Sequence, residues 1–448
     1  MHQDLFLSRN DLFGLVICIM FSWWILSYAK KFYSGDLFYK DFRIGFYLRW
    51  IGVIASAFFN LYIIKADSTS FFGGAKLVAA AIRGSDLSDS VQLFFTGFDD
   101  LPFRMKCFFS NDIIINLIYD NNRTLVHMAG ILSFLTFDSY LAISFVMSMW
   151  AYWGLWLVYA TVIQLYPASR KWLFYLIIAY PPLCFWTTGL MKDPICIGSL
   201  GVLFYVCFNQ KERKLRPYFF CFLGVLAAFL LIKIKGYLFV GFSIAAILAY
   251  FIYRLGKMTA IRRWVSIGVF AMLLLVFFYN FGAQLEDKIF ETFSEEVVDR
   301  ISTVTETQLR HGGSSYDLGE FDLSGWSMVK YSAAAINVAL FRPYVWEYLN
   351  PLVLSSSLEG MLMFFMLLYL VVKIGPKGII SSMGTSPIMI FALIFTIITA
   401  MMAGGIAFNY GTLARYKIPL TPFYFIFMIC IGVIHRQNKT SAPSSSPS

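Results

Sequence analysis

The sequence predicts an all-α, polytopic membrane protein, and two features lead to this fold class. Of its 448 residues, 59% are hydrophobic and only 14% are charged, whereas soluble domains are about half apolar and about a quarter charged. The apolar residues also form continuous runs separated by short polar segments. Such runs are typical of helices that cross a hydrocarbon layer about 30 Å thick.

The apolar runs predict about eleven transmembrane helices. They cover 12–29, 46–64, 140–163, 172–186, 195–208, 218–232, 237–253, 264–281, 361–372, 388–407 and 418–433. Two longer segments, 65–139 and 282–358, are predicted to be large loops. Within the first loop, the apolar stretches 71–82, 91–95, 113–119 and 125–137 are too short to cross, so we expect helices that lie on the outer membrane surface.

The basic residues predict an orientation for these helices. Lys and Arg cluster at 30–43, 170–171, 211–216, 254–263, 373–377 and 436–439. If the spans alternate in direction, all these clusters lie in the cytoplasm and both large loops face outward, as the positive-inside rule requires. The net charge of +10 then reflects topology, and no nucleic-acid partner is expected. The predicted location is the inner (cytoplasmic) membrane of a cell, with multiple crossings.

The same pattern divides the chain into five predicted segments. They are an extra N-terminal span with its basic loop (1–45), a membrane core that includes the first outer loop (46–281), the second outer loop (282–358), the C-terminal spans (359–434) and a disordered Ser/Pro-rich tail (435–448). The polar part of the second loop, 284–322, is either solvated surface or a lid over a site.

Asp67 is the first candidate catalytic residue, because it follows the second predicted span directly. A carboxylate at a membrane–water boundary can act as a general base toward an alcohol. Alternatively, Asp67 caps the helix that follows it. A second carboxylate near Asp67 could hold a divalent cation, but the sequence contains no metal-binding motif and no other cofactor is expected.

Lys192 and Asp193 form the second candidate, in a tight outer turn after the proline-bent stretch 172–186. Charges at a membrane boundary are costly and often functional. The alternative is that Lys192 extends toward water beside an Asp193 that caps the next helix, with Pro194 at its first position.

Several cations fall on the outward face, where the positive-inside rule predicts few. They are Lys233, Lys235, Arg342, Arg415 and Lys417, and the aromatic and acidic neighbours of the arginines are Trp346, Glu347 and Tyr416. Cations that meet near outer headgroups would bind a lipid phosphate or pyrophosphate. Binding of ordinary anionic lipid would explain one or two of them.

The order of span, outer aspartate, long loop with surface helices and return span resembles the N-terminal module of the GT-C membrane glycosyltransferases. Arg415-Tyr416 followed by Pro419 and Pro422 is similar to an Arg-Tyr…Pro pattern near the end of the core in several of these enzymes. The stretches 185–193 and 342–347 resemble parts of bacterial membrane proteins from surface-polysaccharide gene clusters. The resemblance covers the layout of about residues 44–434 but only short motifs.

This resemblance implies a transferase that uses a polyprenyl-phosphate-linked sugar on the outer membrane face, in polysaccharide biosynthesis of the cell envelope. Asp67 would match the first-loop acid, Asp193 a second acid, and Arg415 with Arg342 the groups that hold the lipid phosphate. The chain departs from the family pattern because Ser68, not a second acid, follows Asp67. The acceptor would be a glycan or a lipid.

Three other functions stay open on the sequence alone. A polysaccharide polymerase or ligase of the O-antigen type would share the polyprenyl-linked ligand. A flippase or transporter for lipid-linked glycans is expected to show internal repeats and charges at the membrane midplane. A non-catalytic assembly subunit is the remaining alternative.

Overall fold

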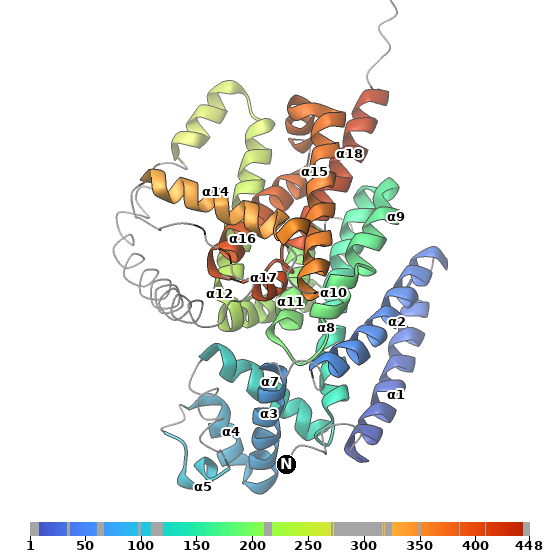
Figure 1. Ribbon diagram of the computed structural model, residues 1–448, viewed down its shortest axis with the longest axis vertical. Helices are drawn as coiled ribbons and strands as arrows, with labels where there is room; N and C mark the ends of the chain where they lie inside the picture. Colours follow the sequence, from blue (N-terminus) through green and yellow to red (C-terminus); the bar gives the residue numbers. More distant parts are fainter. Residues whose placement is uncertain are drawn as a thin grey trace, which may run out of the picture. The chain divides into compact units, whose positions relative to one another are not determined.

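The computed structural model confirms an all-helical chain over the residues that it describes (Figure 1). These residues are 9–33, 36–60, 67–96, 100–108, 120–209, 217–269, 272, 316, 318, 325–347, 351–384, 386–407 and 409–441. Most of the predicted loop 282–358, the stretch 113–119, the basic loop 211–216, the end of the span 264–281 and the tail from 442 lie outside them.

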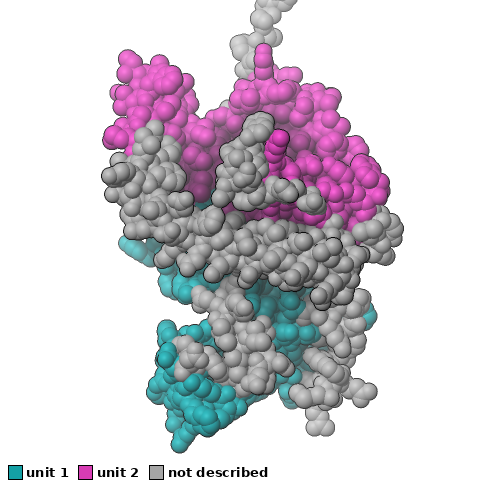
Figure 2. Space-filling model, turned by 60° about the vertical axis from the view of Figure 1, so that its left-hand side comes forward, with its two compact units in different colours: residues 1–242 teal, residues 243–448 magenta. Residues whose placement is uncertain are grey.

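The chain forms two compact units, residues 1–242 and 243–448 (Figure 2). Among the residues that the structure describes, five helices are long and apolar enough to cross a membrane: Asn10–Phe32, Tyr140–Leu165, Tyr218–Gly256, Val353–Met383 and Pro387–Ala407. A sixth results if Tyr410–Tyr416 and Thr421–Thr440, which are bent by 63°, count as one span. The length and hydrophobicity of these helices support the prediction that the chain is a membrane protein.

Helix α8 (Tyr140–Leu165) is the core of unit 1, because it is buried along most of its length. It packs against α11 (Lys192–Phe208), α2 (Asp36–Phe58) and α1 (Arg9–Phe32). Gly154 allows a close approach to α11, since a Cβ atom there would lie 2.5 Å from the Gly198 carbonyl oxygen. Small residues are the usual means by which membrane helices approach each other closely.

An aromatic and charged cluster joins the start of α2 to the far end of α8. Trp156 donates a hydrogen bond to the Tyr33 hydroxyl at 2.6 Å. The Asp41 carboxylate accepts from Tyr159 at 2.6 Å and from Arg170 at 2.9 Å. Each buried polar group of this cluster therefore has a partner, as burial requires.

The described residues of the predicted first outer loop form four helices: α3 (Asp67–Gly84), α4 (Leu87–Phe95), α5 (Phe103–Lys106) and α7 (Asp120–Leu135). Helices α3 and α7 pack together, and Gly130 faces Val78 at their contact. The apolar stretches 71–82 and 91–95 are thus helical, and 125–137 is helical as far as Leu135. Their position on a membrane surface stays a prediction.

The predicted span 172–186 is a broken helix. The 3-10 turn η2 (Pro167–Ser169) precedes it, and it consists of the end of α9 (Arg170–Leu173), a π-helical segment η3 (Phe174–Ile178) and α10 (Pro181–Trp186). The break precedes Pro181, because proline lacks the N–H that a continuous helix needs.

Helix α12 (Pro217–Gly256) has 40 residues, which corresponds to about 60 Å of helix, twice the thickness of the hydrocarbon layer. Its φ and ψ angles depart from helical values at Lys235 (φ −147°, ψ 73°). The sequence predicts two spans here, 218–232 and 237–253, with a four-residue turn between them. The structure has a kink at one residue within that predicted turn.

In unit 2, α16 (Pro387–Ala407) packs against α14 (Gly325–Phe341), α17 (Tyr410–Tyr416) and α18 (Thr421–Ser441). Helix α15 (Pro351–Met383) packs on α18 and α14, and the 3-10 turn η4 (Val345–Glu347) precedes it. Gly375 interrupts α15 with φ +75° directly before Pro376. Only glycine adopts this φ without strain.

Candidate functional site

Asp67 is the first residue of α3, and it is exposed. The next residue, Ser68, is buried and shares a 2.5 Å hydrogen bond with the Tyr140 hydroxyl of α8. This bond ties the start of α3 to the core helix of unit 1. An acid in the first turn also suits the helix dipole, so the general-base and helix-capping interpretations are both compatible with this position.

Asp193 and Lys235 form a buried ion pair. The Lys235 Nζ atom lies 2.8 Å from the Asp193 Oδ1 atom, and the side chains are 9% and 1% exposed, respectively. Asp193 is in the first turn of α11, whereas Lys235 is at the kink of α12. Because its carboxylate is buried against an ammonium group, Asp193 is placed to position Lys235 and not to exchange protons with a ligand in water.

Lys192 begins α11 beside this pair, and its side chain is half-buried. Burial and the Lys235 charge lower the pKa of Lys192 to about 8, against the opposing effects of Asp193 and Asp67. Within the part of the chain that the structure describes, the Lys192 ammonium has no salt bridge and no hydrogen bond. The structure therefore gathers Asp67, Lys192, Asp193 and Lys235 from α3, α11 and α12 into one electrostatic cluster, the unit 1 cluster.

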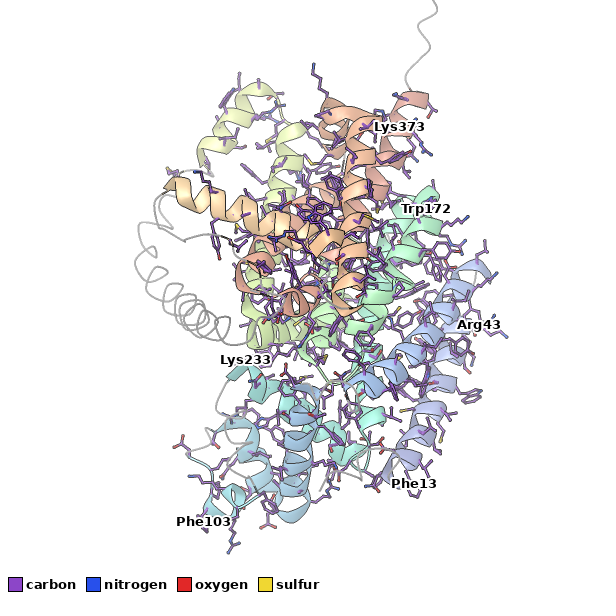
Figure 3. The ribbon with its side chains drawn as sticks, viewed as in Figure 1. Phe13, Arg43, Phe103, Trp172, Lys233 and Lys373 are labelled. Atoms are coloured by element: carbon purple, nitrogen blue, oxygen red, sulfur yellow. The ribbon has the colours of Figure 1, made fainter. Side chains whose placement is uncertain are left out.

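Lys233 is labelled in Figure 3 and is half-buried two residues before the kink. Its predicted role at a lipid phosphate stays a prediction.

The turn that leads to Lys192 is fixed by α2. The Arg49 guanidinium donates to the Leu183 carbonyl at 2.9 Å and to the Thr187 hydroxyl at 2.5 Å. Thr188 donates to the Gly52 carbonyl at 3.0 Å, and Gly189 has φ +91°. These contacts determine where α11, and with it Lys192, begins.

Arg49 is fully buried, and its Nε and Nη2 atoms have no hydrogen-bond partner within the described ranges. Arg49 is not among the site residues predicted from the sequence. The sequence does contain a feature that could have identified it. Arg49 is the one charged residue in the apolar run 46–64, and such charges are usually functional or structural.

In unit 2, Arg342 and Glu347 form an ion pair around η4. The Arg342 Nε atom lies 3.0 and 3.1 Å from the two carboxylate oxygens of Glu347, which also accepts from the Tyr344 backbone N–H at 2.8 Å and the Tyr410 hydroxyl at 3.1 Å. Burial alone would raise the pKa of Glu347, but the Arg342 hydrogen bond and the other donors lower it. The predicted phosphate ligand Arg342 is thus already neutralised by a carboxylate.

Trp346 lies next to this pair. Its ring stacks on that of Tyr344, with centroids 4.8 Å apart and planes at 21°, and 81% of Trp346 is exposed. We call Tyr344 and Trp346 the aromatic platform.

Arg415 and Tyr416 end α17 and are half-buried. The next residue, Lys417, is fully buried, and its Nζ atom lies 2.7 Å from Glu359 Oε2 of α15. Glu359 is not among the site residues predicted from the sequence, although an acid inside the apolar helix 351–383 is the same kind of signal as Arg49.

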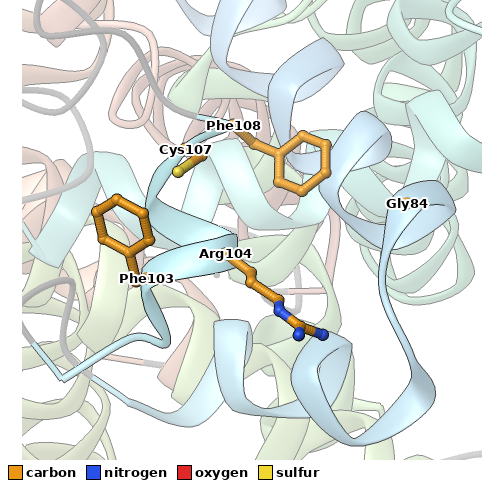
Figure 4. A pocket seen from close by; sticks show the side chains of 5 residues that line it. All are labelled: Gly84, Phe103, Arg104, Cys107 and Phe108. Carbon is orange, nitrogen blue, oxygen red and sulfur yellow. The ribbon is translucent and has the colours of Figure 1, made fainter.

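A hollow at the end of α3 is lined by Gly84, Phe103, Arg104, Cys107 and Phe108 (Figure 4). It contains none of the predicted site residues.

Within the described ranges, no group of three His, Cys, Asp or Glu side chains is placed to hold a metal ion.

No family of known proteins, no curated protein and no solved structure matches this chain.

Proposed function

We propose that the protein is an integral membrane glycosyltransferase that takes a sugar from a polyprenyl-phosphate donor on the outer face of the cytoplasmic membrane. In this proposal the chain crosses the membrane about eleven times in a GT-C-like arrangement. The observation that carries the proposal is the unit 1 cluster, in which the exposed Asp67 carboxylate acts electrostatically on the Lys192 ammonium group, and that ammonium group has no salt-bridge partner in the described part of the chain.

The cluster contains the groups that such a transfer needs. Lys192 binds the donor phosphate and stabilises the negative charge that develops on it. Asp67 accepts the proton of the acceptor hydroxyl as that oxygen attacks the anomeric carbon. The bond between the anomeric carbon and the phosphate oxygen breaks, and its electron pair stays on the polyprenyl phosphate. Asp193 holds Lys235, whose charge adds to the positive potential around Lys192.

The test compares wild type with Asp67→Asn in nanodiscs that contain polyprenyl-phosphate-linked hexoses. We expect the variant to bind the donor but to lose at least about a hundredfold in turnover, the usual contribution of a general base. Asp86→Asn is the matched control, because Asp86 is also an exposed acid at a helix start and makes no side-chain capping bond. A fully active Asp67→Asn protein would overturn the proposed role.

A flippase is the second candidate, since unit 2 has charges buried among its helices. The Lys417–Glu359 pair lies beside the broken helices α17 and α18, and transporters often combine broken helices with buried charges. Sealed liposomes separate the two functions in the same assay. A transferase changes the glycan, whereas a flippase moves the lipid and leaves its glycan unchanged. A polymerase or ligase would be a transferase with a growing glycan as acceptor.

A further inference from the structure

Within the part of the chain that the structure describes, the Trp346 ring of the aromatic platform has one face free. Tyr344 covers one face of the Trp346 indole at a centroid distance of 4.8 Å. The 81% exposure of Trp346 therefore comes from the opposite face and the ring edges. A flat, exposed aromatic face is a surface on which another ring can stack.

The residues beneath the platform hold it in place. Glu347 accepts hydrogen bonds from Arg342, from the Tyr344 backbone and from Tyr410. The Arg342 guanidinium lies 5.9 Å from the Tyr344 ring centroid and 5.7 Å from that of Tyr410, within cation–π range. Because Tyr344, whose ring stacks on Trp346, is held in this way, little ordering is needed when a ligand binds.

Polar groups lie at the edge of the platform. The Asn337 amide nitrogen is 3.2 Å from the Tyr344 hydroxyl, and Asn337 is exposed. Arg342 is paired with Glu347, so the site presents little net charge. An aromatic face bordered by uncharged hydrogen-bonding groups suits a neutral, polyhydroxylated ring better than a phosphate.

We propose that the aromatic platform binds a sugar ring of the glycan acceptor, with the C–H face of the sugar on Trp346 and its hydroxyl groups on Asn337 and Tyr344. The partly positive hydrogen atoms of the sugar C–H bonds are attracted to the negative face of an aromatic ring. This inference rests on the proposed function, to which it adds the substrate class of the acceptor and a site that recognises it.

An anchor in the lipid headgroups is the competing role for an exposed tryptophan in a membrane protein. The observations favour the glycan, because Tyr344 covers one indole face and the fixed ion pair and Asn337 surround the ring with polar groups. An anchor needs no such rigid polar support.

The test measures binding of four soluble hexasaccharides, built from glucose, galactose, mannose or N-acetylglucosamine, to the full chain in nanodiscs. We expect at least one to bind wild type and Trp346→Ala to weaken that binding about tenfold, in line with the loss of a buried aromatic contact at an interface. Trp346→Phe keeps an aromatic face and should retain most of the affinity. The matched control is Trp264→Ala in the same unit, because Trp264 is 74% exposed.

Binding that Trp346→Ala loses and Trp264→Ala keeps would support the platform. Equal binding by both variants, or no binding of any hexasaccharide by wild type, would overturn it. Unchanged sugar binding with reduced thermal stability in lipid, seen for Trp346→Ala alone, would identify an anchor and also overturn it. Failure of the proposed function has a different signature, since the protein would then bind sugars through Trp346 but turn over no polyprenyl-linked donor.

Discussion

Lys192 is the residue whose charge state controls the proposed chemistry of unit 1. Burial and the neighbouring Lys235 lower its pKa to about 8, so a modest change in pH alters its charge. The Asp193–Lys235 pair beside it is more deeply buried, and removal of one partner would leave an uncompensated charge. The two lysines, which are 43 positions apart in the printed sequence, therefore have different roles, one toward the ligand and one within the protein.

The pH dependence of donor use tests this role of Lys192. The ammonium form predominates below about pH 8, so phosphate binding should be lost as the pH rises through that value. We expect kcat/KM to fall about tenfold per pH unit on the alkaline side, since kcat/KM reports ionisation of the free enzyme. Lys192→Arg should remove this decline, because arginine stays charged, whereas Lys192→Gln should weaken donor binding at every pH. An unchanged alkaline decline in the arginine variant would contradict the assignment.

At the scale of elements, close helix contacts position the residues of the cluster. Helices α8 and α11 approach through Gly154 and Gly198, and the turn before α11 is held on α2 by Arg49. The apolar runs predict that these helices exist. They do not predict which glycines face each other, because a helix that is apolar on all sides has no face that identifies its neighbour.

Gly154→Ala tests the contact between α8 and α11. The added Cβ atom would lie 2.5 Å from a backbone oxygen, which cannot move away as a flexible side chain would. We expect a loss of about 1–3 kcal/mol in stability, the usual cost of overpacking, and a lower thermal midpoint in nanodiscs.

The matched control is Gly432→Ala in α18, where a Cβ atom meets nothing within 4 Å. This change should be neutral or slightly stabilising, since alanine favours helices more than glycine does. Equal midpoints for the two variants would show that α8 and α11 tolerate a wider spacing than the structure has.

At the scale of the whole molecule, each unit has its own buried central helix, α8 in unit 1 and α16 in unit 2. The boundary at 242/243 falls inside α12, within the predicted core segment 46–281. Both units also bury charged side chains, including Arg49, Asp193, Glu359 and Lys417. An unpaired charge in the membrane is costly. The helices of each unit must therefore pack so that these buried charges meet their partners.

The predicted orientation of the chain can be tested by labelling. Single cysteines at Ser88, in the first predicted outer loop, and at Lys377, in a predicted cytoplasmic loop, are introduced into a variant without the seven native cysteines. A membrane-impermeant maleimide added to intact cells should label position 88 and not 377. Labelling of both positions only after the membrane is opened would refute an outward first loop.

The sequence by itself determined the membrane class and the helical composition, because apolar content and continuous apolar runs are local properties of the chain. It also indicated Asp67, Lys192 and Asp193, since a charge beside an apolar run is visible without a fold. Only the tertiary structure decided which distant charges meet: Lys235 with Asp193, and Lys417 with Glu359. The physical reason is that an ion pair depends on distances between side chains far apart in sequence, and helix packing alone determines those distances.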